Sequence, residues 1–337
     1  MFELVAVGSA IAATVTLTAS GGAPRPGGLA AEATGSEQVA LVLPSGTRYA
    51  DLVPWSTQSF RSAGASFGFD TRVFAGMTSG LEDRIEAGAF DLVMVVGQAA
   101  TDAVLPVVED VDKTAFVFLD ASVADLSLAG APNASAVRFA DEQTSQLAGY
   151  LSSQVPRRSA NGPVDMVSVV AGPETAHARR VANGFRRGAE RLRSRDVEVR
   201  IDYVNGSNLA ECERVANEQI DAGSDVIFVD AGRCGLGALA VARLRGVWGI
   251  GGYDGGVKPG PHVLAMFYKD FDRAIKWTLS DYAVDALRPG RDTVLGLNED
   301  YAVGVDAGNL NAAIPESVWS SVVRLCSSIR SHTADPA

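Results

Sequence analysis

Gly232 and Arg233 lie in a glycine-rich loop whose backbone N–H groups could bind a polar ligand. The loop follows a short apolar run at residues 225–229, and Gly235 and Gly237 then let the backbone turn into a helix. In open α/β sheets the ligand binds at the carboxyl ends of the strands, which is where this loop falls. The alternative is a tight turn that leaves Arg233 exposed.

Polar and aromatic side chains follow the next two expected strands, at residues 248–252 and 262–268. A pocket for a small polar ligand needs a few polar groups that fix its orientation, and often an aromatic face that stacks on it. Asp254 and Lys269 could form a charge pair in such a site, and a hinge salt bridge or a solvated pair is an equal alternative. Tyr253 could stack on a ring of the ligand or donate its hydroxyl, and plain packing is its alternative.

Ser45, Tyr49 and Gln98 are further candidates for ligand binding because each lies just after an expected strand. Each side chain offers a hydroxyl or an amide group that could bind a polar ligand. Their assignment depends on position in the chain alone.

Patterns for catalysis and metal binding are poor in this sequence. The three histidines, His177, His262 and His332, are scattered, and neither a P-loop nor an H-E-x-x-H motif occurs. A G-x-S-x-G string at residues 64–68 follows an expected helix and precedes a strand, which is the reverse of a nucleophile elbow. We therefore expect a binding protein rather than an enzyme, with no metal and no cofactor.

The composition argues against nucleic acid as a partner. The chain has 337 residues, 47% hydrophobic and 20% charged, with a formal net charge of −11 and a pI of about 4.8. An acidic protein repels phosphate backbones, and no long run of like charges is present as a binding tail. The three cysteines, Cys212, Cys234 and Cys326, have neither zinc-ligand nor C-x-x-C spacing, so we interpret them as small buried hydrophobic residues.

Alternating strands and helices indicate the fold class. Such alternation predicts βαβ units with parallel sheets, and the length suffices for two α/β lobes that share a ligand cleft. A first series ends at an Ala-, Ser-, Gly- and Pro-rich break at residues 120–135, and a second begins at residues 164–170. We place one lobe at residues 37–138 plus 256–293 and the other at residues 139–255 plus 294–330, with a tail at 331–337.

The first 36 residues have the pattern of an apolar leader and a flexible linker. Residues 1–19 are apolar and nearly uncharged, and the chain to about residue 35 is rich in Gly, Pro and Ala. Residues 17–22 resemble a bacterial lipobox in which Ser20 replaces the cysteine that would carry the lipid. We favour export or membrane tethering over a buried or disordered leader, and we expect an extracytoplasmic protein that acts as a monomer.

Four segments resemble the basic membrane protein family of substrate-binding proteins, which includes nucleoside-binding lipoproteins of ABC importers. They are GSDVIFVDAGRCGLG at residues 223–237, RRVANGFRRGAE at 179–190, RFADEQTSQLAGYL at 138–151, and the C-terminal strand and closing helix within 295–329. The resemblance implies a type I periplasmic-binding fold, in which three crossovers join two Rossmann-like lobes. The crossovers would fall near Phe139, near residues 254–257 and near residues 292–295.

The resemblance also implies capture of a small polar ligand, with a nucleoside as the first guess, and delivery to an ABC permease. The chain departs from the family pattern where Pro44 replaces an acidic residue after the first strand and Gln98 replaces an aromatic after the third. Tyr253 stands at the family's ribose-binding aspartate, with Asp254 one place later, while the lysine of the next strand is kept as Lys269.

Two other classes of function remain open at this point. A ligand-sensing regulatory protein of the same fold is the main alternative, and the altered site favours it slightly. A transcription repressor is less favoured because no helix-turn-helix precedes residue 38 and the chain is acidic. An enzyme would require a catalytic group in the cleft that the sequence does not obviously offer.

Overall fold

The computed structural model describes residues 36–45, 53–158, 163–192, 196–206, 208–252, 260–298 and 302–332. The leader, Tyr49, Tyr253 and Asp254 lie outside these ranges, so the expectations that rest on them stay predictions. Within the described ranges, no helix combines the length and the apolar character that crossing a bilayer requires.

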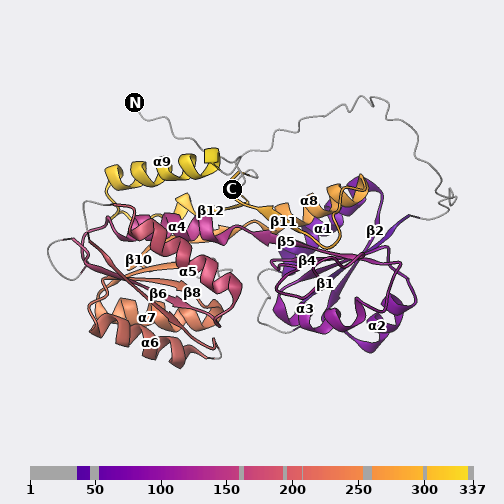
Figure 1. The fold of residues 1–337 in the computed structure, drawn as a ribbon, viewed down its shortest axis with the longest axis horizontal. Coiled ribbons are helices and arrows are strands. Elements are labelled where there is room, and N and C mark those ends of the chain that lie inside the picture. Colours follow the sequence, from indigo (N-terminus) through magenta and orange to yellow (C-terminus); the bar gives the residue numbers. More distant parts are fainter. Residues whose placement is uncertain are drawn as a thin grey trace. The chain divides into compact units, whose positions relative to one another are not determined.

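Two six-stranded sheets form the framework of the described chain (Figure 1). The first sheet contains β1 (Gln38–Leu43), β2 (Asp70–Ala75), β3 (Leu92–Val96), β4 (Ala115–Leu119), β5 (Ala134–Phe139) and β11 (Asp292–Leu295). The second contains β6 (Met166–Ala171), β7 (Glu198–Tyr203), β8 (Val226–Asp230), β9 (Trp248–Gly252), β10 (Val263–Lys269) and β12 (Val303–Val305).

Both sheets have the same doubly wound strand order. The first runs β11-β5-β4-β3-β1-β2 and the second β12-β10-β9-β8-β6-β7. All neighbouring strands are parallel except the antiparallel pair of β10 and β12. The expected α/β class with two parallel sheets is therefore confirmed.

Helices cover both faces of each sheet (Figure 1). Beside the first sheet lie α1 (Val53–Phe67) and α8 (Phe271–Ala283) on one face, and α2 (Ser79–Glu86) and α3 (Gln98–Val104) on the other. Beside the second sheet, one face carries α4 (Asp141–Ser152), α5 (Ala176–Ala189) and, next to α4, α9 (Glu316–His332), and the other carries α6 (Leu209–Asp221) and α7 (Gly235–Arg245).

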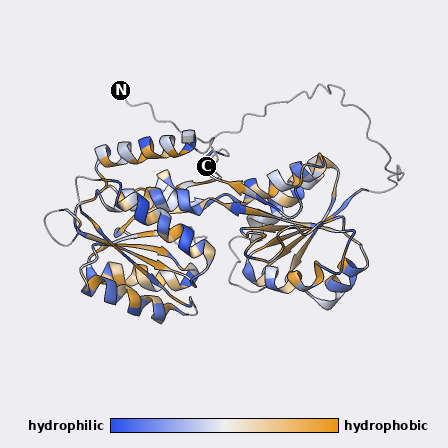
Figure 2. Cartoon of the chain, viewed as in Figure 1, coloured by the Kyte–Doolittle hydropathy of each residue, from blue (hydrophilic) through white to orange (hydrophobic). Residues whose placement is uncertain are grey.

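The strands consist largely of buried apolar residues, as is typical of parallel sheets. Figure 2 shows most of the strand ribbons in the hydrophobic colour. Alternation within β1 divides its residues between two cores. Val39 and Leu41 contribute to a cluster that also includes Phe139, whereas Ala40 and Val42 belong to the core beneath α2 and α3. The cluster containing Phe139 continues onto one face of the second sheet, so a single apolar core extends through the region where the chain crosses.

The chain passes between the sheets three times, after β5, after β10 and after β11. The expectation of a crossover near residues 254–257 is wrong, because β10 pairs with β9 and remains in the second sheet. The Gly- and Pro-rich stretch before β10 suggested a boundary, but it connects two neighbouring strands of one sheet. The first part of the predicted 256–293 segment, up to Lys269, therefore belongs to the other lobe.

Helices α4 and α5 are in unusually close contact, and three glycines make this possible. A Cβ atom at Gly149 would overlap the carbonyl oxygen of Phe185, and one at Gly188 would overlap that of Gln146. Gly184 likewise faces the backbone of α4. The glycines of the sequence RRVANGFRRGAE are thus needed because two helix backbones meet there without intervening side chains.

Replacing Gly188 by Ala should destabilise the protein by about 1–3 kcal/mol, because the added methyl group forces the two backbones apart. The free energy of unfolding from urea denaturation measures this effect. Gly80→Ala is the matched control, since a methyl group added at Gly80 of α2 would have open space around it, and should be neutral or slightly stabilising. Equal stability of Gly188→Ala and wild type would contradict the close helix contact.

Candidate functional site

Lys269, the last residue of β10, is held by carboxylates from two distant parts of the chain. Its Nζ lies 3.0 Å from both carboxylate oxygens of Asp120 and 2.9 Å from Oδ2 of Asp141. Asp120 directly follows β4 of the first sheet, and Asp141 is the first residue of α4 beside the second sheet. The ammonium group therefore connects the carboxyl ends of strands from both sheets, which is where α/β proteins bind ligands.

The turn that carries Asp120 is fixed by a crossover strand. Asp120 has a left-handed backbone with a φ of 62°, and its N–H donates to the carbonyl of Val137 at 2.8 Å. The hydroxyl of Ser122 and the N–H of Val123 donate to the Asp292 carboxylate at 2.7 and 2.8 Å. Because Asp292 begins β11, this strand holds the turn that presents Asp120.

His177 extends the group of charged side chains along α5. Thr175 caps this helix by accepting the N–H of Ala178 at 3.1 Å, which places His177 in the first turn. Nε2 of His177 lies 3.7 Å from Oδ2 of Asp141 and 3.9 Å from Oδ2 of Asp230, the last residue of β8. We refer to five residues as the strand-end cluster: Asp120, Asp141, His177, Asp230 and Lys269.

Burial and charge shift the pKa values of two members of the cluster. Burial raises the pKa of Asp141 to about 6, although Lys269 opposes this shift. For Lys269, burial alone lowers the pKa, but Asp120, Asp141 and Asp230 together hold it well above its ordinary value. Lys269 is therefore charged at physiological pH, while Asp141 loses its charge on mild acidification.

Two arginines on elements that also carry or adjoin cluster residues form ion pairs with carboxylates outside the cluster. Nη2 of Arg180 on α5 lies 3.6 Å from Asp125, in the segment that follows β4. Nη1 of Arg138 on β5 lies 3.1 Å from Glu142 of α4. The charge of the cluster is consequently set by its three aspartates against Lys269, and His177 adds a positive charge only when it is protonated.

Among the predicted ligand-binding residues, Lys269 is the one that the structure places in the cluster. Asp254 lies outside the described residues, so its expected pair with Lys269 stays a prediction. The described partners of Lys269 are instead Asp120 and Asp141.

The other predicted ligand-binding residues that the structure describes also lie at strand ends. None of them has a described contact with the strand-end cluster. Ser45 after β1 is exposed, and Gln98 at the start of α3 is exposed and donates to Asp102 of its own helix at 2.6 Å. Gly232 and Arg233 are exposed in a 3-10 turn, η3 (Gly232–Cys234), that leads into α7. Their ligand-binding role stays a prediction.

Four members of the cluster were missed by sequence reasoning. Asp120 and Asp230 directly end the apolar runs TAFVFL and DVIFV, so the strand-end rule that selected Gln98 could have found them. Asp141 and His177 instead occupy the first turns of two helices. Only the packing of α4 against α5 brings those two side chains together, and no local pattern signals it.

The glycine loop is joined to a neighbouring helix by a disulfide between Cys212 of α6 and Cys234 of η3. The interpretation of these two cysteines as simple hydrophobic residues is therefore wrong, although both are buried as expected. They are 22 residues apart, and the packing of α6 beside η3 brings their Cα atoms to 5.5 Å. Cys326 is a half-buried free thiol.

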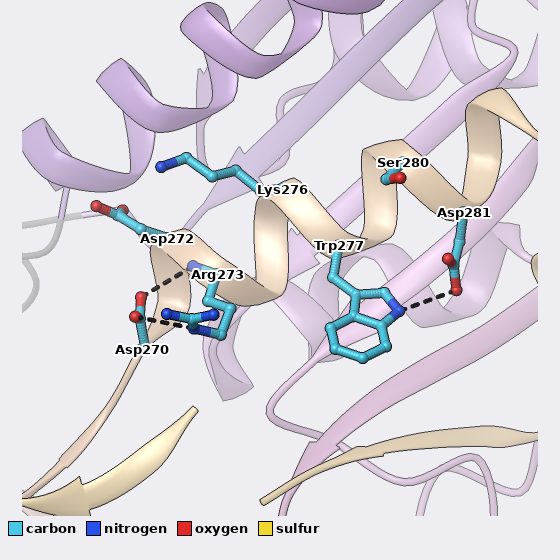
Figure 3. Close-up of a pocket in the computed structure, with 7 residues that line it drawn as sticks. All are labelled: Asp270, Asp272, Arg273, Lys276, Trp277, Ser280 and Asp281. Atoms are coloured by element: carbon cyan, nitrogen blue, oxygen red, sulfur yellow. Dashed lines mark hydrogen bonds and ion pairs between the residues drawn. The ribbon is translucent and has the colours of Figure 1, made fainter. Parts of the chain in front are cut away.

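A groove along α8 is a second polar feature of the described chain (Figure 3). There the Trp277 indole donates to Asp281 at 3.1 Å, and Arg273 pairs with Asp270 at 3.4 Å. All lining residues come from this one helix and its N-cap, Asp270, and the groove is open to solvent, so we assign the ligand site to the strand-end cluster instead.

Within the part of the chain that the structure describes, no group of three His, Cys, Asp or Glu side chains is arranged to hold a metal ion. In the strand-end cluster, the ammonium group of Lys269 lies between carboxylates where a cation would otherwise bind. The cluster can therefore accept and donate hydrogen bonds but offers no metal centre.

Solved structures of solute-binding proteins have the same fold. An ABC transporter solute-binding protein from Aeropyrum pernix K1 aligns with a TM-score of 0.67 and 17% identity, covering 88% of this chain and 92% of that chain. A transcriptional activator of the comK gene from Bacillus halodurans aligns with a TM-score of 0.68 and 15% identity, covering 89% and 100%. These likenesses confirm the type I periplasmic-binding architecture, and the second shows this fold in a regulatory protein.

Residues 72–323 match the family model described as ABC transporter substrate-binding protein PnrA-like, and the chain belongs to this family. Basic membrane protein B of Borreliella burgdorferi is 28% identical over 178 residues, which are 52% of this chain and 49% of the relative. The ABC transporter nucleoside-binding protein BmpA of Lactococcus lactis subsp. cremoris is 24% identical over 159 residues, 47% of this chain and 42% of the relative. The chain spans about half the length of these curated relatives.

Replacing Asp141 by Asn should stabilise the protein relative to wild type increasingly as the pH rises. The pKa of Asp141 is raised from 3.8 to about 6 on folding, so its contribution to stability is full below pH 3.8 and is lost as the pH rises through 6. A shift of this size corresponds to roughly 3 kcal/mol, a cost at neutral pH that asparagine avoids.

Melting temperatures of both proteins between pH 4.5 and 7.5 provide the measurement. The difference between Asp141→Asn and wild type should grow across this window. Asp83→Asn, on the exposed surface of α2, is the control and should show a flat difference. A flat difference for Asp141→Asn as well would show that burial does not set the pKa of this carboxyl group.

Proposed function

We propose that the protein is an extracytoplasmic solute-binding protein that captures a small polar ligand at the strand-end cluster for an ABC importer. The position of Lys269 carries this proposal, because its ammonium group contacts carboxylates presented by both lobes. The contacts of a group at the junction of two lobes change both when a ligand binds there and when the lobes move about their hinges. Membership of a substrate-binding family supports the same role.

Binding exchanges contacts within the cluster for contacts to the ligand. The carboxylates accept hydrogen bonds from ligand hydroxyls, and the ammonium group of Lys269 donates to a ligand oxygen. Because Lys269 already pairs with Asp120 and Asp141, a neutral ligand can enter without adding an unpaired charge to the cluster. The lobes then close about the crossovers, and the closed form, a single chain, docks on the permease without chemical conversion of the ligand.

A nucleoside is the first candidate ligand. Its support is the Lactococcus lactis relative that is named as nucleoside-binding, together with carboxylates and a lysine that suit a sugar. The base has weaker support, because Gln98 stands where the family often has an aromatic residue. Tyr49 and Tyr253 are the aromatic candidates for stacking, and both lie outside the described residues.

The buried disulfide supports a location outside the cytoplasm. Disulfides persist in oxidising compartments and are rare where thiols are kept reduced. The bond between Cys212 and Cys234 is therefore consistent with an exported protein, as substrate-binding family members are. Tethering through the leader remains a separate part of the proposal.

Ligand sensing without transport is the second candidate function. One observation favours it, namely the likeness in fold to the Bacillus halodurans transcriptional activator. A sensor would use the same closure at the strand-end cluster to alter a protein partner. Ligand-dependent binding to a reconstituted ABC permease separates the two functions, since transport requires it and sensing does not.

Nucleosides should raise the melting temperature of the purified protein, because a ligand that binds the folded state stabilises it. A panel of nucleosides, sugars and amino acids tests which chemical class of ligand binds. A ligand present at 100 times its Kd should stabilise the folded protein by about 2.7 kcal/mol. Lys269→Met should abolish the shift, since two carboxylates lose their counter-charge.

Lys276→Met is the matched control for this experiment because Lys276 is exposed on α8, and it should retain the full shift. Absence of a shift with every nucleoside would exclude the nucleoside assignment. Unchanged ligand affinity in Lys269→Met would exclude the strand-end cluster as the site.

Thiol labelling of the exported protein should modify Cys326 alone when the protein is unfolded without reductant, and all three cysteines after reduction. Mass spectrometry after iodoacetamide treatment counts the modified residues. The double variant Cys212→Ser with Cys234→Ser is the control, because one modified cysteine is expected with or without reductant. Three modified cysteines in unreduced wild type would argue against an oxidising location.

A further inference from the structure

The Ala-, Ser-, Gly- and Pro-rich break at residues 120–135 leads from β4 into β5, which are neighbouring parallel strands of the first sheet. We call its first part, residues 120–130, the interlobe turn. The N–H of Leu128 donates to the carbonyl oxygen of Val123 at 2.7 Å, and both side chains are buried in the core beneath α2 and α3. The interlobe turn is therefore built into the first lobe and has a defined conformation.

Strand β11 and the residues before it hold the interlobe turn at both ends. Near the start of the turn, the Asp292 carboxylate accepts the two hydrogen bonds described above. At its end, the N–H of Gly130 donates to the carbonyl oxygen of Gly290 at 3.3 Å, and a Cβ atom at Gly290 would overlap the backbone of Gly130. The turn is thus fixed to a strand that leads directly into a crossover, so its position relative to the second lobe changes when the lobes move about that crossover.

Two carboxylates of the interlobe turn reach side chains of the second lobe. Asp120, at its start, binds Lys269 within the strand-end cluster. Asp125, near its middle, lies 3.6 Å from Nη2 of Arg180 on α5. The side chains of Asp125 and Arg180 are 36% and 33% exposed, and neither residue belongs to the cluster. This second pair can therefore remain intact while a ligand takes over the contacts of Lys269.

We propose that the ion pair of Asp125 and Arg180 is an interlobe latch, which stabilises the conformation in which the strand-end cluster is assembled. The inference rests on the proposed function for the use of that conformation in ligand capture. The apparent Kd of a ligand equals its intrinsic Kd divided by the fraction of protein in the binding-competent conformation. The latch therefore sets part of the affinity through a contact that the ligand does not make.

The expected strength of the latch follows from its exposure to water. An ion pair near the surface shifts an equilibrium by up to about fivefold, because solvent screens its charges. Reversing one charge should have a larger effect than removing it, since a repulsion between like charges then replaces the attraction. The contact of Asp120 with Lys269 is not altered in such variants, so the cluster keeps its own residues.

The test measures the arrangement of the lobes without any ligand, by double electron–electron resonance between two spin labels. The labels are attached to Asp83→Cys on α2 and Leu244→Cys on α7, which are exposed sites in different lobes. Every protein also carries Cys326→Ser, so that the free thiol is not labelled. The distance distribution then reports how often the lobes adopt the wild-type arrangement.

We expect Asp125→Arg to lower the population at the wild-type distance, relative to other distances, by about fivefold or more. Arg180→Asp should have the same effect. The double variant that carries both changes should restore the wild-type distribution, because the pair re-forms with its charges exchanged. Glu109→Arg, an equal charge change at an exposed site of the first lobe, is the control and should leave the distribution unchanged.

The results are compared once melting curves show that the variants are folded. A distribution that Asp125→Arg leaves unchanged overturns the latch, and so does a double variant that fails to recover. If adenosine binds wild type, its Kd should rise in Asp125→Arg and return in the double variant, and a constant Kd would overturn the role of the latch in capture. If adenosine does not bind, the distance distributions alone decide on the latch, while the wider ligand panel decides on the proposed function.

Discussion

The double ion pair of Lys269 is the interaction on which the candidate site depends. One ammonium group meets Asp120, which the first sheet presents, and Asp141, which begins a helix beside the second. Neither carboxylate is placed by its own segment alone. Asp292 of β11 holds the turn that carries Asp120, and the glycine contacts between α4 and α5 position Asp141 against His177. Helix packing and crossover strands thus determine the electrostatics at the strand ends.

The fold could be predicted from the sequence because its signals are local and repeated. Apolar runs such as Leu92–Val96 and Val226–Asp230 are short enough to be strands, and glycines or helix caps follow them. The family resemblance then supplied the two-lobe plan and the three crossovers. The second crossover was misplaced because a Gly- and Pro-rich loop within a lobe has the same composition as a boundary between lobes. Only the pairing of β10 with β9 shows that β10 belongs to the second sheet.

The site was less predictable because its members meet through tertiary packing. Lys269 was found through the family resemblance, whereas Asp120 and Asp230 stand at strand ends, as Gln98 does, and were not selected. Asp141 and His177 lie 36 positions apart by residue number and show no spacing that indicates contact. The Cys212–Cys234 bond is similar, since its partners lie in a helix and a turn that become neighbours only once α6 packs beside η3.

The order in which the strands are synthesised has a consequence for how the protein matures. One edge strand of each sheet, β11 or β12, comes from the last quarter of the sequence, whereas the opposite edges, β2 and β7, are made earlier. Until those residues emerge from the ribosome, β5 and β10 present unpaired backbone edges, and the Asp292 carboxylate that steadies the turn at Asp120 is missing. Both sheets therefore reach their full width, and the turn at Asp120 its carboxylate partner, only when the last quarter of the chain has been made.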